Sequence, residues 1–141
     1  MLKEYNIKNI YQGRLYTGDD LLKELTSIVK GKGIKVGKIS AIGAVQRAKI
    51  SYYNQDEQVY QAKEFEKHLE IVNLLGNISI KDEEVMIHAH ISLGDDEGNL
   101  FGGHLAEGTM VFACEFIIEE YQGEPLERVY DETTGLTLWN E

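Results

Sequence analysis

The chain has 141 residues, of which 43% are hydrophobic and 27% charged, which fits one globular domain over residues 1–141 and excludes a disordered protein. Its formal net charge is -10, from 14 basic and 24 acidic residues, and this argues against direct DNA binding because phosphate contacts require a basic surface. The single cysteine, Cys114, excludes an internal disulfide and is expected to be a buried thiol. Without a secretory signal or an apolar run of about 20 residues, a cytoplasmic protein with no membrane span is expected.

One helix is predicted early in the chain. Thr17 is the expected N-cap, and Asp20 three residues later completes the capping pattern at the positive end of the helix. Gly31 and Gly33 are expected to end the helix, because glycine accepts the left-handed conformation of a C-terminal cap. Between these ends, apolar residues recur at helical spacing and define one buried stripe, which consists of Leu21, Leu22, Leu25, Ile28 and Val29.

Most of the remaining chain has the alternating, β-branched pattern of strands. The expected strands are residues 34–43, 48–54, 58–65, 69–80, 85–93, 100–105 and 109–121, with turns at 94–99 and 131–136. Gly76 is predicted to mark a bulge or bend. One helix among many strands predicts an α+β fold, in which an antiparallel-rich, partly barrel-like sheet has one principal helix packed on it. The open edges of such a sheet favour a subunit interface.

A trio of histidines is the sharpest chemical pattern. His88 and His90 point to the same face of their predicted strand, because side chains alternate. His104 follows a short turn, so its strand is expected to pair beside the first. Three neutral imidazoles with an open position are typical of a catalytic-type zinc site, although imidazole also binds copper, iron and nickel. We therefore predict a divalent-metal site, zinc first, at these residues; the alternative is a set of partly buried histidines held by hydrogen bonds.

Other residues are weaker candidates for a role in such a metal site. Glu107 or Glu70 could supply a fourth ligand or orient an imidazole through a hydrogen bond. In a small zinc enzyme, Glu107 would be the first candidate for the general base, and Arg14 or Arg47 would bind an anionic group. His68 lacks neighbouring histidines and is expected at the surface or in an interface. The sequence contains no recognised hydrolase motif such as His-Glu-x-x-His.

Two segments resemble the plants and prokaryotes conserved (PPC) domain family. They are IHAHISLGD at residues 87–95 and GGHLAEGT at residues 102–109. Similar segments at 13–15, 19–22, 39–44 and 69–79 extend the resemblance over essentially the whole chain, in the family's order. The resemblance implies an α/β fold with an antiparallel sheet, a homotrimer, and a regulatory or assembly role for a stand-alone prokaryotic member.

The resemblance also bears on DNA. In plant members the domain follows AT-hook motifs, which bind the minor groove of A·T-rich DNA, and those proteins are nuclear regulators. An AT-hook has an Arg-Gly-Arg core, whereas Gly13-Arg14 lacks the second arginine, so no DNA-binding residue is predicted. Prokaryotic members are nevertheless often named DNA-binding proteins. Plant members usually lack histidines at the positions of His88, His90 and His104, so the resemblance implies a metal site specific to the prokaryotic branch.

Three functions are open at this point. The first is a homotrimeric assembly or regulatory domain with a structural or sensing metal site. The second is a small zinc-dependent, hydrolase-like metalloenzyme that uses the same histidines. Direct DNA binding is the third, and the net charge of -10 predicts it to be weak and strongly salt-dependent.

Overall fold

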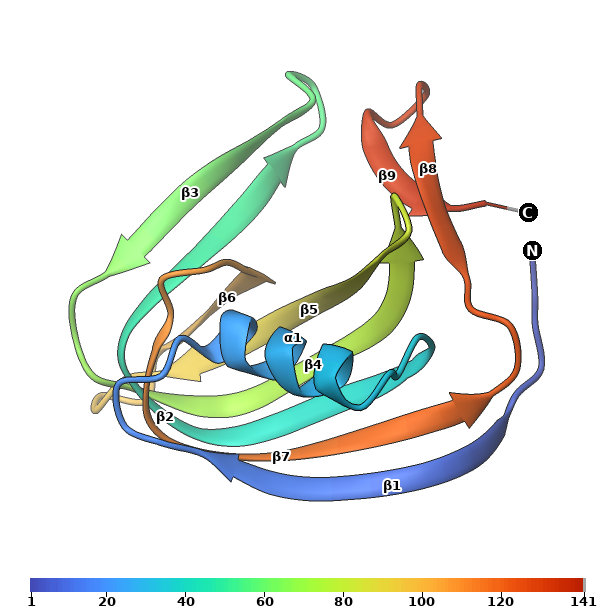
Figure 1. Cartoon of the computed structure of the whole chain (residues 1–141). Coiled ribbons are helices and arrows are strands. Elements are labelled where there is room, and N and C mark those ends of the chain that lie inside the picture. The colour runs from blue at the N-terminus through green and yellow to red at the C-terminus, as the bar shows by residue number, and fades with distance from the viewer. Residues whose placement is uncertain (141) are drawn as a thin grey trace.

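The computed structural model describes residues 1–140, which form a nine-stranded, mainly antiparallel sheet with one helix packed on it (Figure 1). In chain order the elements are β1 (Asn6–Leu15), α1 (Leu21–Gly31), β2 (Gly37–Asn54), β3 (Val59–Phe65), β4 (Leu69–Lys81), β5 (Glu84–Gly94), β6 (Leu100–Leu105), β7 (Met110–Gln122), β8 (Glu127–Asp131) and β9 (Leu136–Trp139). The predicted fold class is confirmed. No helix among residues 1–140 is long and apolar enough to cross a membrane.

The sheet curls into a partial ring because β2 takes part in it twice. The first part of β2, residues 37–45, lies between β4 and β7. The second part pairs with β3 from Ala48 onward and meets β6 at Ile50 and Ser51. Strands β6, β5 and β4 then pair in succession and lead back to the first part of β2, so both parts of β2 border the same curved group of strands. Strand β8 extends the sheet by a parallel pairing with β4.

The two strands predicted at 34–43 and 48–54 form one continuous strand in the structure. Register shifts at Ala44, Val45 and Arg47 against β7 redirect β2 without ending it. Gly43 permits the bend, because its φ is +146° and a Cβ there would collide with the carbonyl oxygen of Ala113. The loss of regular alternation in this segment therefore marks a bulge and not the end of a strand.

Helix α1 has Asp20 as its N-cap, not Thr17 as predicted. The Asp20 carboxylate accepts hydrogen bonds from the backbone N–H groups of Lys23 (3.2 Å) and Gly108 (2.7 Å), so it caps the helix and fixes the loop before β7. Thr17 instead donates its hydroxyl to the carbonyl oxygen of Phe112 (2.7 Å). The predicted stripe is buried against the sheet through Leu21, Leu25 and Val29.

The hydrophobic core lies between α1 and the sheet, and β5 shows how this orients the histidines. His88 and His90 point away from the core, because the residues that alternate with them are buried in it: Ile87, Ala89, Ile91 and Leu93. Cys114 on β7 belongs to the same core, as predicted, and burial raises the pKa of its thiol to about 11.

The sequence pattern does not predict β1, β8 or β9. Most residues of β1 are exposed, and β8 and β9 have only 5 and 4 residues, so none of them has a long apolar alternation. The predicted turn at 131–136 is confirmed and connects β8 to β9 as an antiparallel hairpin. This hairpin lies beside the histidines, as described below.

Candidate metal site

The three predicted histidines lie together on adjacent strands. His90 on β5 pairs directly with His104 on β6, and His88 lies on the same face of β5. The ring centroids are 4.9 Å apart for His88 and His104, 5.3 Å for His88 and His90, and 5.6 Å for His90 and His104. One ring nitrogen from each residue lies within 4.8 Å of the others. Strand pairing therefore brings three imidazoles to one place.

This arrangement fits a metal ion. In a tetrahedral zinc site with bonds of about 2.1 Å, the ligand nitrogens are roughly 3.4 Å apart, which small ring rotations reach from the observed spacing. Nδ1 of His104 is buried and has no hydrogen-bond partner among the described residues. A buried polar atom without a partner is costly, and coordination to a metal would remove that cost.

Burial keeps two of the imidazoles neutral. The pKa of His88 is lowered to about 4, first by burial and then by repulsion from His104 when that ring is protonated and from the Arg128 guanidinium. Burial likewise lowers the pKa of His104. His90 is exposed and forms the solvent side of the cluster. Because neutral imidazole is the form that binds metals, the two more buried rings are ready to bind at neutral pH.

A buried arginine lies against this cluster. Arg128 on β8 is 7% exposed, and its Nη2 is 3.5 Å from Nδ1 of His88. Its Nε donates to the hydroxyl of Ser79 (2.7 Å), and Nη2 donates to the side-chain carbonyl of Asn77 (2.9 Å). Nη1 donates to the backbone carbonyl of Thr137 (3.1 Å). These bonds hold the guanidinium in place, and burial lowers its pKa.

Sequence reasoning misses Arg128. It lies in a short strand without a recognisable motif, and only the parallel pairing of Ile80 with Glu127 and of Lys81 with Arg128 brings that strand to β4. No local pattern could have indicated this contact, because tertiary pairing sets it.

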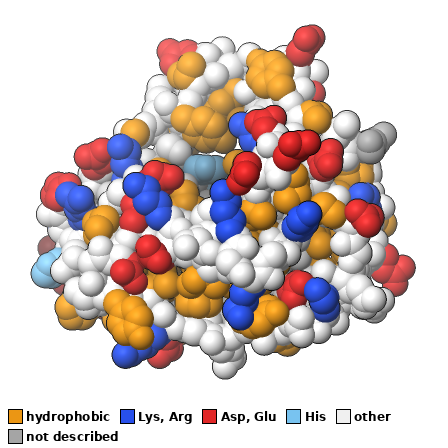
Figure 2. Space-filling model, in the orientation of Figure 1, with side chains coloured by type: hydrophobic (Ala, Val, Ile, Leu, Met, Phe, Trp, Pro, Cys, Tyr) orange, Lys and Arg blue, Asp and Glu red, His pale blue; other side chains and the backbone are white. Residues whose placement is uncertain are grey.

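The β2–β3 hairpin and the β8–β9 hairpin stand on either side of β5 (Figure 1). The tip of the β2–β3 hairpin meets the β8–β9 hairpin, where the Tyr53 hydroxyl donates to the carbonyl oxygen of Thr134 (2.6 Å). Below this contact, the ring of Tyr60 on β3 lies 5.2 Å from the ring of His104. Figure 2 shows a histidine side chain at the base of the hollow between the hairpins. The cluster is therefore screened from bulk solvent on two sides.

A groove of about 740 Å³ opens beside the cluster. His88 and His90 line it from β5, and Ser92 and Asn73 add polar groups. Its other walls are mainly apolar and include Leu75, Tyr121, Leu126 and Trp139. Apolar walls with a few polar groups are typical of small-molecule sites.

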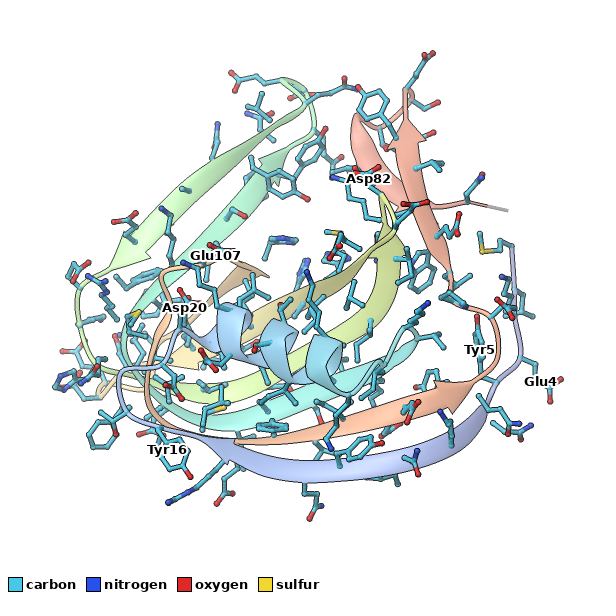
Figure 3. The ribbon with its side chains drawn as sticks, in the orientation of Figure 1. Glu4, Tyr5, Tyr16, Asp20, Asp82 and Glu107 are labelled. Carbon is cyan, nitrogen blue, oxygen red and sulfur yellow. The ribbon has the colours of Figure 1, made fainter. Side chains whose placement is uncertain are left out.

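The carboxylates considered from the sequence have other surroundings. Glu107 is exposed and forms a 3.3 Å ion pair with Lys23 of α1, close to the N-cap Asp20 (Figure 3). Glu70 is exposed near the start of β4, opposite Gly94. Neither carboxylate makes a hydrogen bond or ion pair with an imidazole in the described structure.

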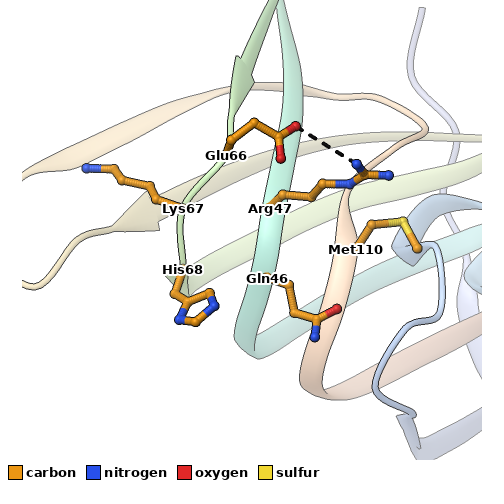
Figure 4. A pocket seen from close by; sticks show the side chains of 6 residues that line it. All are labelled: Gln46, Arg47, Glu66, Lys67, His68 and Met110. Carbon is orange, nitrogen blue, oxygen red and sulfur yellow. Dashed lines mark ion pairs between the residues drawn. The ribbon is translucent and has the colours of Figure 1, made fainter.

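The two arginines considered from the sequence also lie elsewhere. The Arg14 guanidinium lies over the ring of Tyr16, 4.9 Å from its centroid. Arg47 forms a 3.9 Å ion pair with Glu66 in a separate surface pocket that His68 also lines (Figure 4). His68 is exposed, as predicted.

Comparison with known proteins identifies the family to which this chain is similar. The model of the Plants and Prokaryotes Conserved domain, abbreviated PCC or PPC, matches residues 2–122. The chain is 42% identical to the metal-containing protein AF0104 from Archaeoglobus fulgidus, with a TM-score of 0.95 and coverage of 100% of this chain and 99% of that chain. It is 36% identical to a plant- and prokaryote-conserved protein from Pyrococcus horikoshii, with a TM-score of 0.93 and coverage of 100% and 98%.

Similarity also extends to part of a larger protein. The chain is 27% identical over 128 residues to the bifunctional protein GlmU of a Synechococcus strain, and the match covers 89% of this chain. The chain spans only 19% of the length of that relative, so the similarity concerns one part of it. From the match over residues 2–122 and the two solved structures, the chain belongs to the plants and prokaryotes conserved (PPC) domain family.

Proposed function

We propose that this chain is a PPC protein that binds one divalent metal ion, zinc first, through His88, His90 and His104. The observation that supports this most directly is their convergence, with one nitrogen from each ring within 4.8 Å of the others and with Nδ1 of His104 buried without a partner in the described residues. The similar Archaeoglobus protein is a metal-containing protein, which supports a metal here as well. Zinc accepts three imidazoles and keeps a fourth position open.

The metal content of the purified protein tests this proposal. After incubation with zinc and removal of free ions, mass spectrometry should find one equivalent of metal per chain. His88→Ala, His90→Ala and His104→Ala should each remove most of it, whereas the matched control His68→Ala should retain it. Anomalous scattering from crystals would identify and locate the ion. A wild-type protein without stoichiometric metal contradicts the proposal.

The surroundings of the site favour binding over hydrolysis. A zinc hydrolase needs a general base within hydrogen-bond reach of the metal-bound water. No aspartate or glutamate is among the described residues that line the groove, and the Glu107 carboxylate is paired with Lys23. We therefore place the metalloenzyme second. Hydrolysis of p-nitrophenyl acetate by the zinc-loaded protein, well above the rate of the His104→Ala variant, would reverse this order.

We also propose a homotrimer with a role in assembly or regulation. The family resemblance implies this assembly, and Ile42, Leu75 and Ile117 support it, because they are exposed on the neighbouring strands β2, β4 and β7. Apolar patches of this kind are typical of interfaces. Light scattering after size-exclusion chromatography should give three times the 16.0 kDa chain mass. A monomer at micromolar concentration contradicts this part of the proposal.

A further inference from the structure

Arg128 is a buried cation whose hydrogen-bond acceptors are all neutral. They are the hydroxyl of Ser79, the side-chain carbonyl of Asn77 and the backbone carbonyl of Thr137, and a longer contact of 3.5 Å joins Nη2 to Nδ1 of His88. The guanidinium also lies over the ring of Trp139, 5.3 Å from its centroid. No ion pair joins Arg128 to a carboxylate within residues 1–140. Buried charges are normally paired, and among residues 1–140 this one has no carboxylate as its complement.

Among the described residues, seven of the thirteen other basic side chains differ from Arg128 in this respect. Seven basic residues, all more exposed than Arg128, form ion pairs with aspartate or glutamate: Lys8, Lys23, Lys30, Lys38, Arg47, Lys49 and Lys67. The one arginine that is buried instead approaches an imidazole of the proposed metal site, at 3.5 Å. A bound divalent ion would add its own positive charge beside that guanidinium. An anion is the physical complement of such a site.

The donors that remain on Arg128 indicate the kind of anion. A guanidinium has five N–H groups, and the three hydrogen bonds to oxygen use one each on Nε, Nη1 and Nη2. Of the remaining two N–H groups, the one on Nη2 faces Nδ1 of His88 at 3.5 Å, and the one on Nη1 has no acceptor among the described residues. A carboxylate or phosphate oxygen beside Nη1 could accept that bond and would complement the charge of the guanidinium.

On the basis of the proposed metal site, we propose that a small-molecule oxyanion binds the open metal position and Arg128 at the same time. The chemistry that a carboxylate and a phosphate share here is a pair of charged oxygens. Arg128 does not itself line the groove, but it contacts Asn77, His88 and Trp139, which do. The mainly apolar walls of the groove favour a carboxylate with an apolar body. Leu75 and Leu126 in its walls would contact the apolar part.

Cobalt(II)-loaded protein provides the test, because ligands in the fourth position change its visible absorption spectrum. Hexanoate, acetate and inorganic phosphate are titrated separately into the wild type and three variants. We expect saturable spectral changes, with hexanoate binding more tightly than acetate and phosphate. Arg128→Gln should weaken hexanoate binding about tenfold or more at unchanged cobalt stoichiometry, since charge-assisted hydrogen bonds are lost. Arg128→Lys should be intermediate, and the matched control Arg47→Gln should equal the wild type.

Each contrary outcome is informative. Cobalt binding with equal hexanoate affinity in the wild type and Arg128→Gln overturns the inference and leaves the metal site intact. Absence of cobalt binding by the wild type overturns the metal site and the inference with it. Tighter binding of phosphate than of hexanoate overturns the carboxylate assignment. Should Arg128→Gln fail to fold by circular dichroism, Arg128→Lys decides: unchanged affinity overturns the inference, because lysine keeps the charge but lacks the planar N–H donors of the guanidinium.

Discussion

His90 and His104 face each other across the β5–β6 ladder, with ring centroids 5.6 Å apart. An ion bound by both would link two strands directly, and through His88 it would bind a second position on β5. The unfolded chain does not hold these side chains together. Metal binding should therefore favour the folded state and raise stability with the concentration of free ion.

Zinc is expected to protect the protein against heat. At free zinc one hundred times the dissociation constant, the stabilisation is about 2.7 kcal/mol, which corresponds to a Tm increase on the order of 5–10 °C. Differential scanning calorimetry with zinc and with a chelator measures it. The increase should vanish in His104→Ala and persist in His68→Ala. An equal increase in His104→Ala would argue against His104 as a ligand.

Glu120 on β7 connects the first strand of the chain to the rest of the sheet. Its carboxylate, in a residue that is 7% exposed, accepts hydrogen bonds from Asn9 (2.8 Å), Lys8 (2.7 Å) and Tyr11 (3.2 Å) on β1. These bonds, that of Asn9 first, hold the pKa of the Glu120 carboxyl below its usual value. The resulting stability is present above the usual carboxyl pKa and is lost as the pH falls through the lowered one.

Glu120→Gln should accordingly lower the free energy of unfolding by about 1–2 kcal/mol at pH 7. The difference from the wild type should shrink as the pH falls from the usual carboxyl pKa through the lowered one, because the unfolded chain then binds a proton more readily than the folded protein. Urea denaturation at pH 7 and at pH 3.5 measures both values. Glu64→Gln, which removes an exposed ion pair with Lys49, is the control and should change stability by less than about 0.5 kcal/mol. A difference independent of pH would contradict this account of Glu120.

Gly43 is expected to tolerate no side chain. Its φ of +146° disfavours other residues, and an added Cβ would collide with the Ala113 carbonyl oxygen, so Gly43→Ala should cost roughly 3 kcal/mol. Gly31→Ala, at a helical position with open space around the added Cβ, should be neutral or should stabilise by up to about 1 kcal/mol. Chemical denaturation compares them, and similar effects of the two substitutions would show that the bend in β2 is not constrained as described.

Direct DNA binding is expected to be weak. The net charge is -10, and on the face shown in Figure 2 the basic side chains are interspersed with acidic ones. Fluorescence anisotropy with an A·T-rich duplex at physiological salt should give a dissociation constant weaker than about 10⁻⁴ M, the upper end of non-specific binding. Tight binding under these conditions would overturn our interpretation of the charge.

The sequence predicts the histidine cluster well because its determinants are local. Strand alternation places His88 and His90 on one face, and the short turn at 94–99 makes β6 the neighbour of β5. Arg128 could not be predicted, because a parallel pairing with a distant strand brings it to the site. The N-cap of α1 also differs from the prediction, because Asp20 and not Thr17 caps the helix. The Asp20 carboxylate accepts a second hydrogen bond from Gly108, a residue distant in the sequence.

The double use of β2 limits how the length of this chain can vary. Residues 37–45 are held between β4 and β7, while Ser51 of the same strand pairs with His104. Adding or deleting one residue between these parts would turn every later side chain of β2 to the opposite face. The part of β2 beside His104 would then turn its opposite face to that histidine. Related sequences should therefore keep a constant number of residues between positions 45 and 51. The turn at 55–58 leads to the edge strand β3, and there the length is constrained instead by a contact with the β8–β9 hairpin, because Gln58 donates to the carbonyl oxygen of Thr133 (3.2 Å).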